Sequence, residues 1–188
     1  MLTMEEFYLL EHSCQYKIVK ALTDKTSLSQ LAQSHDFIIR EEVANNINTP
    51  PGVLMKLASD EVHYVRQAVA RNSSTPKEAF ILLANDEVIE VRKALIENLS
   101  TPFEVQEMLA QDCNEYIRVI LAESINTPVT ILEKLAKDSV WQVRESVARN
   151  MNASQEILMK LSKDERYAVR LAIAYRRGAI CQKRDTLF

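Results

Sequence analysis

The sequence VRQAVARNSSTPKEAFILLAND, residues 65–86, is followed 26 residues later by VRKALIENLSTPFEVQEMLAQD, residues 91–112. Both stretches begin with Val-Arg, have Asn at the eighth position and Thr-Pro at the eleventh and twelfth, and end in Asp. A period of this length predicts stacked supersecondary units, each of which needs its neighbours to bury its apolar face. The chain is therefore expected to be a repeat array rather than a single globular core.

One arginine marks the period along the chain. It recurs every 26 residues, and an aspartate stands six residues before most of these arginines. The arginine positions are Arg40, Arg66, Arg92, Arg118, Arg144 and Arg170. The aspartate positions are Asp60, Asp86, Asp112, Asp138 and Asp164, and Ser34 takes the place of an aspartate before the first arginine.

Composition favours a helical chain with a core. Of 188 residues, 47% are apolar and 26% charged, and only two Gly and five Pro occur, which is low for a β protein with many turns. The net charge of −3 argues against a generic polyanion binder. The three cysteines have no disulfide or zinc spacing, and no signal peptide or apolar run of about 20 residues is seen. We therefore expect a cytoplasmic protein.

Each repeat is predicted to contain two helices. The first would start at Asp60 as N-cap and end at Asn72, a residue type that tolerates the left-handed conformation of a helix terminus. The second would start with a capping box between Thr75 and Glu78, with Pro76 at the first helical position. Ser154 lacks the Thr-Pro pair, so its cap is expected to be the weakest of the set.

Three apolar columns are predicted to form a continuous core, because each recurs at the repeat period. The first is Ile39, Val65, Val91, Ile117, Val143 and Val169. The second is Val43, Val69, Leu95, Leu121, Val147 and Ile173. The third is Leu31, Leu57, Leu83, Leu109, Leu135 and Leu161. Full burial of each such side chain contributes ~1.5–3 kcal/mol.

These patterns predict an all-α, right-handed α-solenoid, a superhelix of about six 26-residue two-helix repeats. We expect an N-terminal capping helix at 1–22, the repeat solenoid at 23–178 and a C-terminal tail at 179–188. The cap should be one long helix, opened by Thr3 and Glu6 as a capping box. The last repeat lacks a following Thr-Pro helix, so it should leave a face on which the tail or another molecule docks.

The unit from Val65 to Asp86 resembles the leucine-rich repeat variant (LRV) family over about residues 23–177. This resemblance implies a bacterial α-solenoid in which an α-helix often alternates with a 3₁₀-like helix. The Asp-x-x-x-x-Val-Arg core is also similar to HEAT repeats, which implies bonds between aspartates and arginines six residues apart, such as Asp60 with Arg66. Some variant-repeat proteins carry an iron–sulfur cluster ahead of the repeats. Cys14 is alone in that region here, so we expect no cofactor and no metal.

Two polar columns have two interpretations each. The arginines could grip phosphates or an acidic peptide, but the matching aspartates favour an internal ladder, so that Arg92→Ala should lower thermal stability sharply. The second column is Asn46, Asn72, Asn98 and Asn150, with Ser124 as a substitute. These asparagines could end helices, or they could bond an extended peptide, which makes Asn72 and Asn98 candidate protein-binding residues.

A third column contains aromatic residues near the start of each first helix. Its candidate protein-binding residues are Tyr64, Tyr116, Trp141 and Tyr167. Tyr and Trp are typical of protein-binding hot spots. The alternative is that these rings pack between neighbouring repeats.

The sequence predicts a non-enzymatic scaffold for protein–protein interaction, with an unidentified protein or peptide as partner and no membrane. No HExxH, GxSxG or glycine-rich phosphate loop occurs, and no histidine has a paired nucleophile motif. Self-association through the open last repeat is one alternative. Nucleic-acid binding through the basic C-terminal end is the other. That end contains Lys160, Lys163, Arg166, Arg170, Arg176, Arg177, Lys183 and Arg184.

Overall fold

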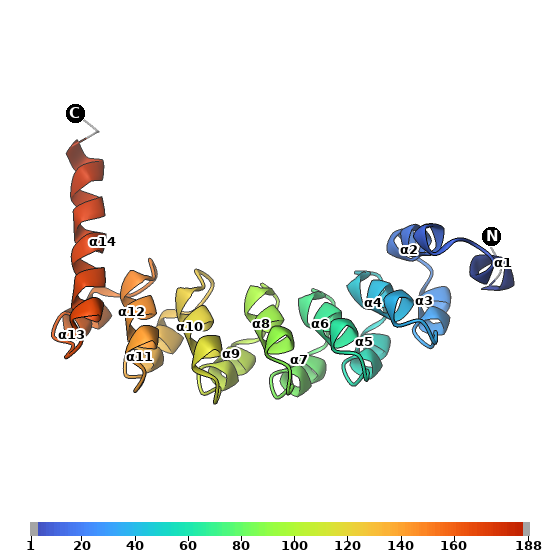
Figure 1. Cartoon of the computed structure of the whole chain (residues 1–188), viewed down its shortest axis with the longest axis horizontal. Helices are drawn as coiled ribbons and strands as arrows, with labels where there is room; N and C mark the ends of the chain where they lie inside the picture. The colour runs from blue at the N-terminus through green and yellow to red at the C-terminus, as the bar shows by residue number, and fades with distance from the viewer. Residues whose placement is uncertain (1–3, 186–188) are drawn as a thin grey trace. The chain divides into compact units, whose positions relative to one another are not determined.

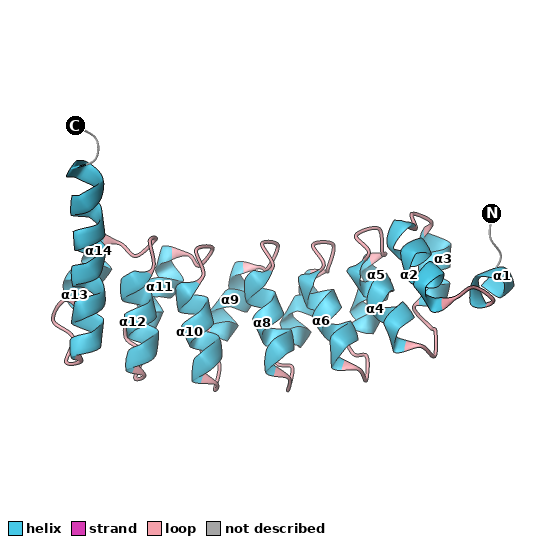
Figure 2. Ribbon diagram, turned by 45° about the horizontal axis from the view of Figure 1, so that its top comes forward, coloured by secondary structure: helices cyan, strands magenta, loops and turns pink. Residues whose placement is uncertain are grey.

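The computed structural model of the chain describes residues 4–185, and within that range it is all helical. In this described part of the chain, fourteen helices are joined by short turns (Figures 1 and 2). The chain divides into two compact units, Met1–Pro102 and Phe103–Phe188, which we call unit 1 and unit 2 and describe separately. No helix within residues 4–185 has the length and apolar character needed to cross a membrane.

Between residues 25 and 161, seven-residue helices alternate with nine-residue helices. Unit 1 starts with α1 (Met4–Tyr8) and α2 (His12–Ala21) and continues with α3 (Lys25–Leu31), α4 (Phe37–Asn45), α5 (Pro51–Leu57), α6 (His63–Arg71), α7 (Lys77–Leu83) and α8 (Ile89–Glu97). Unit 2 contains α9 (Phe103–Leu109), α10 (Glu115–Glu123), α11 (Val129–Leu135), α12 (Trp141–Arg149), α13 (Gln155–Leu161) and the longer α14 (Tyr167–Asp185).

The nine-residue helices form one layer in each unit. In unit 1, α4 packs on α6 and α6 on α8, and in unit 2, α10 packs on α12 and α12 on α14. The seven-residue helices contact this layer from one side, as α5 and α7 do with α6. All three predicted apolar columns are buried, with no side chain in them more than 4% exposed. The α-solenoid fold and its core columns are thus confirmed.

The short helices are α-helices, which decides between the α and 3₁₀-like geometries that the family resemblance left open. In α5, Leu54 N–H donates to Pro50 O at 3.1 Å, and Ala58 N–H donates to Leu54 O at 2.9 Å. Both bonds span four residues, which is the α-helical spacing.

The predicted single N-terminal helix is in fact two. Glu11 separates α1 from α2 with an extended backbone, at φ −60° and ψ 143°. The buried amide of Gln15 donates through Nε2 to Phe7 O at 3.0 Å, a carbonyl that also accepts from Leu10 N–H at 3.2 Å, and so connects the start of α2 to the end of α1. Thr3, expected to cap this segment, lies outside the described residues.

Two predicted caps are also corrected. Asp60 is not the N-cap of α6, because its Oδ1 accepts from Val62 N–H at 2.9 Å and the helix begins only at His63. Thr75 does not cap α7, because its hydroxyl donates to Val69 O at 2.7 Å in the last turn of α6. Short polar side chains in turns favour such local bonds to the backbone.

Two helix ends differ from expectation as well. Asn72 ends α6 in the extended region, at φ −72° and ψ 126°, and not in the left-handed conformation. Ser154, expected to be the weakest cap, accepts from Ile157 N–H at 3.3 Å and caps α13. At the end of unit 2, α14 runs on without a break at residue 178, so residues 179–185 of the predicted tail are helical.

Candidate functional site

Arginine–aspartate pairs connect successive repeats. Arg40 donates to the carboxylate of Asp60 through Nε at 2.7 Å and through Nη2 at 2.9 Å. The same two-bond geometry joins Arg66 to Asp86, Arg118 to Asp138 and Arg144 to Asp164, at distances from 2.6 to 3.1 Å. Such bidentate pairs are among the stronger hydrogen bonds in proteins. We call these four pairs the arginine–aspartate ladder.

The remaining guanidinium nitrogen, Nη1, donates to a main-chain carbonyl in the turn that precedes the helix of the same arginine. Arg66 Nη1 donates to Asp60 O at 2.8 Å, and Arg40 Nη1 donates to Ser34 O at the same distance. Arg92, which is 7% exposed, donates in the same way to Asp86 O at 2.6 Å. Because the acceptor is a main-chain carbonyl, Ser34 serves this contact as well as an aspartate does.

This geometry corrects the pairing implied by the HEAT-like core. Asp60 and Arg66, six residues apart, do meet, but through the main-chain carbonyl of Asp60. The carboxylate of Asp60 instead binds Arg40, twenty residues earlier in the chain. The side chain is held in that direction because its Oδ1 also accepts from Val62 N–H. The predicted internal ladder therefore exists, with partners one repeat away from those expected.

The ladder shifts the pKa of its acidic members. Burial works to raise the pKa of Asp60 and of Asp138, but hydrogen bonds from Arg40 and Arg118, with those from the following backbone, outweigh it and hold both pKa values below the usual range. The hydrogen bond from Arg144 lowers the pKa of Asp164. In turn, the hydrogen bond that each guanidinium donates to its partner carboxylate raises the pKa of Arg40, Arg118 and Arg144. These groups stay charged at neutral pH.

The asparagine column makes a second internal ladder. Asn72 donates through Nδ2 to Ala44 O at 2.7 Å and to Asn46 O at 2.9 Å, and its Oδ1 accepts from Ser74 N–H at 2.8 Å. Asn98 repeats this pattern on Ala70 O and Asn72 O. Both N–H groups of each amide are therefore used inside the protein, which corrects the peptide-binding role expected for Asn72 and Asn98.

Arg176 occupies the asparagine position of the last repeat, a role that was not predicted from the sequence. It donates through Nη1 to Asn150 O and through Nη2 to Met151 O at 3.0 Å. The signal was its place 26 residues after Asn150. One of the predicted basic residues is thus engaged with the backbone. Lys160, Lys163, Arg166 and Arg170 are exposed, and the side chains of the other three lie outside the described part.

The aromatic candidates differ in exposure. Tyr64 in unit 1 and Tyr116 in unit 2 are each 52% exposed, and Tyr167 is 67% exposed. Trp141 is half-buried on α12. The ring of His63 lies beside that of Tyr64, with 4.1 Å between centroids. The three tyrosines therefore present large amphipathic rings to solvent from the first turns of α6, α10 and α14, and the tryptophan does so only in part.

Exposed apolar residues also follow the asparagine column, and they were not among the predicted site residues. They are Ile47 and Leu99 in unit 1 and Ile125 and Met151 in unit 2, each between 68% and 79% exposed. Each stands one residue after an asparagine or serine of the second polar column, and that spacing was the available signal. Ile47 lies beside a hollow of 420 Å³ that Lys20 and Glu42 also line.

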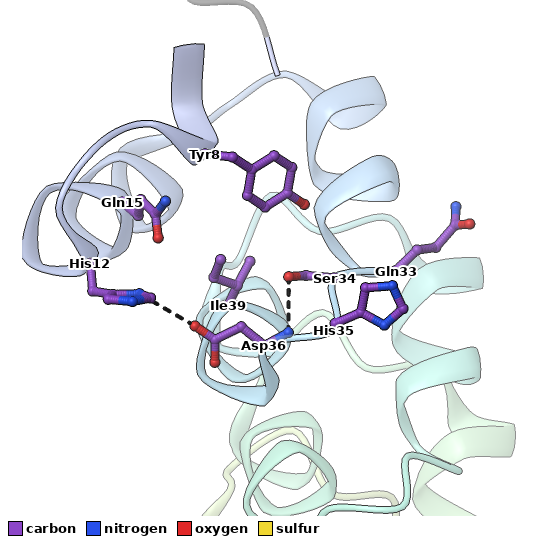
Figure 3. Close-up of a pocket in the computed structure, with 8 residues that line it drawn as sticks. All are labelled: Tyr8, His12, Gln15, Gln33, Ser34, His35, Asp36 and Ile39. Atoms are coloured by element: carbon purple, nitrogen blue, oxygen red, sulfur yellow. Dashed lines mark hydrogen bonds and ion pairs between the residues drawn. The ribbon is translucent and has the colours of Figure 1, made fainter. Parts of the chain in front are cut away.

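A pocket of about 530 Å³ lies near the start of unit 1 (Figure 3). His12 Nδ1 is 3.6 Å from Asp36 Oδ2, and Asp36 also caps α4 by accepting from Ile38 N–H. Tyr8 and Gln15 face the same space as Ile39. Within the described residues no group of three or more metal-ligating side chains is present. The carboxylate of Asp36 is thus used in a helix cap, and Figure 3 also marks its contact with the imidazole of His12.

No protein-family model matches the chain, and no curated protein matches it. A solved structure described as a leucine-rich repeat variant with a novel repetitive protein structural motif is similar to it. The two are 24% identical, the match covers 90% of this chain and 78% of that chain, and the TM-score is 0.46. That description names the family whose repeat the sequence resembles.

Proposed function

We propose that this chain is a non-enzymatic repeat scaffold that binds a partner protein through exposed aromatic side chains on its nine-residue helices. The observation that carries the proposal is the exposure of Tyr64 and Tyr116 at the same position of two repeats, 52% in each case. Tyr is among the residues that contribute most to binding energy in protein interfaces. The cysteine spacing favours a reducing compartment, and we place this function in the cytoplasm.

The ladders support the proposal because they fix the backbone that carries these rings. Tyr64 lies two residues before Arg66, whose guanidinium is bonded to Asp86 and to the turn at Asp60. Tyr116 lies two residues before Arg118, which makes the corresponding bonds to Asp138 and Asp112. A surface that is ordered before binding loses less conformational entropy when a partner arrives.

The ladder also weakens the idea that the arginine column grips phosphates. Four of its guanidinium groups are paired with carboxylates, and their side chains are only 10–13% exposed. Nucleic-acid binding would have to rely instead on the exposed basic residues of α13, of α14 and of the turn between them. Charge is the one feature that favours that alternative, and the test below includes it.

The experiment compares capture of partners from a lysate of the native cells by the intact chain and by a Tyr64→Ser/Tyr116→Ser variant. The captured protein is then purified, and its affinity for both forms is measured. We expect the variant to bind at least about tenfold more weakly, because truncation of a hot-spot residue costs ~2 kcal/mol or more. A Leu99→Ser/Ile125→Ser variant is the matched control, since it removes two apolar residues that are more exposed than the tyrosines and lie at the other end of the nine-residue helices.

Equal affinity of the tyrosine variant and the intact chain would refute the aromatic surface. Loss of binding in the Leu99→Ser/Ile125→Ser variant alone would show that the partner binds at these exposed apolar residues and not at the tyrosines. Nuclease treatment of the lysate and a gel shift over a salt series test the nucleic-acid alternative. Binding to nucleic acid that weakens steeply with salt would favour that alternative over the scaffold.

A further inference from the structure

The face of α14 that points away from α12 is open, although α14 covers the same face of α12, and α12 covers that of α10 (Figure 1). Ala174 is exposed, whereas the residues at its position in earlier repeats are buried. They are Ala44, Ala70, Ile96, Ala122 and Ala148. Arg170 is likewise exposed, whereas Arg144 is buried at the same position of α12.

The guanidinium of Arg170 is nevertheless already oriented. Its Nη1 donates to Asp164 O at 2.5 Å and to Glu165 O at 2.9 Å. Arg144 Nη1 is held in the same way by Asp138 O at 2.8 Å and by Ser139 O at 3.1 Å. The Cζ atom of Arg170 also lies 5.9 Å from the centre of the Tyr167 ring, on the same helix.

What distinguishes the two arginines is the other edge of the guanidinium. In Arg144, Nε and Nη2 bind the carboxylate of Asp164 at 2.7 and 3.0 Å. In Arg170, the same two nitrogens face no carboxylate among the described residues. The last repeat therefore has the arginine of such a pair without its aspartate. In the preceding repeats, that aspartate comes from the turn before the next nine-residue or longer helix.

We propose that Arg170, with Tyr167 and Ala174 beside it, is a docking site for an aspartate-bearing turn of an acidic partner protein. The partner's carboxylate would be bound as Arg144 binds Asp164, through Nε and Nη2. This inference rests on the proposed scaffold function and adds to it a second contact with a defined chemistry.

Charge supports an acidic partner. Between residues 160 and 170 the exposed cations are Lys160, Lys163, Arg166 and Arg170. The acids there are Asp164, which is paired with Arg144, and Glu165, which also lies 3.5 Å from Arg144 Nη2. A surface with this excess of positive charge attracts acidic partners and speeds their association.

A second copy of the chain does not fit the site. The ladder position nearest the start of the chain is Ser34, which has no carboxylate. Asp60, Asp86, Asp138 and Asp164 are each bound to an arginine of their own chain. Asp36, which lies close to Ser34, already caps α4 and contacts His12.

The test uses the full chain and a synthetic peptide with the sequence of residues 82–90. This peptide carries Asp86, Glu87 and Glu90 and has no basic residue, and its aspartate is one that the ladder binds. The readout is the ¹H–¹⁵N resonance of Arg170 Nε, identified by its absence in Arg170→Lys. A matched peptide has Asp86→Asn, and a matched chain has Arg166→Lys.

We expect the peptide to shift the Arg170 Nε resonance in a saturable way. The Asp86→Asn peptide and the Arg170→Lys chain should each bind about tenfold more weakly, because charge-assisted bonds are lost although the charge of the lysine remains. The Arg166→Lys chain should bind like the original. Circular dichroism and thermal melting show whether each variant is folded.

Equal binding of the two peptides, or of the Arg170→Lys and original chains, would overturn the proposal. So would Arg170-dependent dimers of the chain alone in sedimentation, or Arg170-dependent binding of a single-stranded oligonucleotide without binding of the peptide. The tyrosine variant described above leaves α14 intact. Failure of the aromatic surface and failure of this site are therefore separate results.

Discussion

Arg144 binds Asp164 through two hydrogen bonds, at 2.7 and 3.0 Å, although twenty residues separate them. The same guanidinium donates to Asp138 O at the start of its own helix. The side chain of Arg144 therefore stabilises both the turn before its own helix and the turn before the next one. Since the aspartate is also held by Arg166 N–H, the pair joins backbone to backbone across two repeats.

Replacement of one ladder arginine should destabilise the chain much more than replacement of the last arginine. Arg144→Ala is expected to lower the free energy of unfolding by ~3–5 kcal/mol, because it leaves the buried carboxylate of Asp164 without its partner. Arg170→Ala, at the same position of the next repeat, should cost no more than about 1 kcal/mol, because the side chain is exposed. Urea unfolding measures both, and equal losses would contradict the ladder.

Acid should weaken the fold through the ladder. The pKa values of Asp60, Asp138 and Asp164 are lowered in the folded chain, so the folded state binds fewer protons than the unfolded state. Their contribution is complete above the unfolded pKa of about 3.9 and is lost as the pH falls through the lower folded values. Urea unfolding between pH 7 and pH 3 should show this loss.

The control for the acid experiment is Asp164→Asn. This variant should be less stable at pH 7, and its stability should fall less steeply below about pH 4, because one low-pKa carboxylate is gone. Parallel curves for the variant and the original chain would show that Asp164 has no part in the acid effect.

The asparagine ladder predicts a second stability difference. Asn72→Ala should cost ~1–3 kcal/mol, because the carbonyls of Ala44 and Asn46 lose a buried donor. Asn48→Ala is the matched control, since Asn48 is exposed and makes one long bond, at 3.3 Å, to Leu22 O. Thermal melting should rank the two variants in that order. The reverse order would show that the Asn72 amide is not structural.

The corrected role of Thr75 can be tested against the capping box. Thr75→Val removes the hydroxyl that donates to Val69 O and should cost ~0.5–1.5 kcal/mol. Glu78→Ala should change the free energy of unfolding by less than about 0.5 kcal/mol, because Glu78 is an exposed surface residue. A larger loss of unfolding free energy in Glu78→Ala than in Thr75→Val would show that the predicted capping box between these residues does stabilise the helix.

The buried columns could be predicted from the sequence because burial follows the repeat period. Ile39, Val43 and Leu31 recur with small variations in every repeat, and only a two-helix unit places all three columns inside. The existence of an internal arginine ladder was also predictable, because arginines and aspartates recur together. Periodic spacing shows which residues share an environment.

Spacing alone does not show which member of a repeating set binds which. Asp60 is six residues from Arg66 and twenty from Arg40, and the shorter separation was the wrong choice for the carboxylate. The direction of that side chain depends on its own bond to Val62 N–H, a local turn that the period does not encode. The same limit applies to Thr75, whose hydroxyl turns back to the preceding helix rather than forward.

The side chains of the asparagine ladder donate to main-chain carbonyls, such as those of Ala44 and Asn46. These carbonyls are present whatever side chains the neighbouring repeat carries. Duplication or deletion of one whole 26-residue module would therefore preserve the joints on either side. Evolution can in this way lengthen or shorten such an array, and diversify its outer residues, without redesigning the connections between modules.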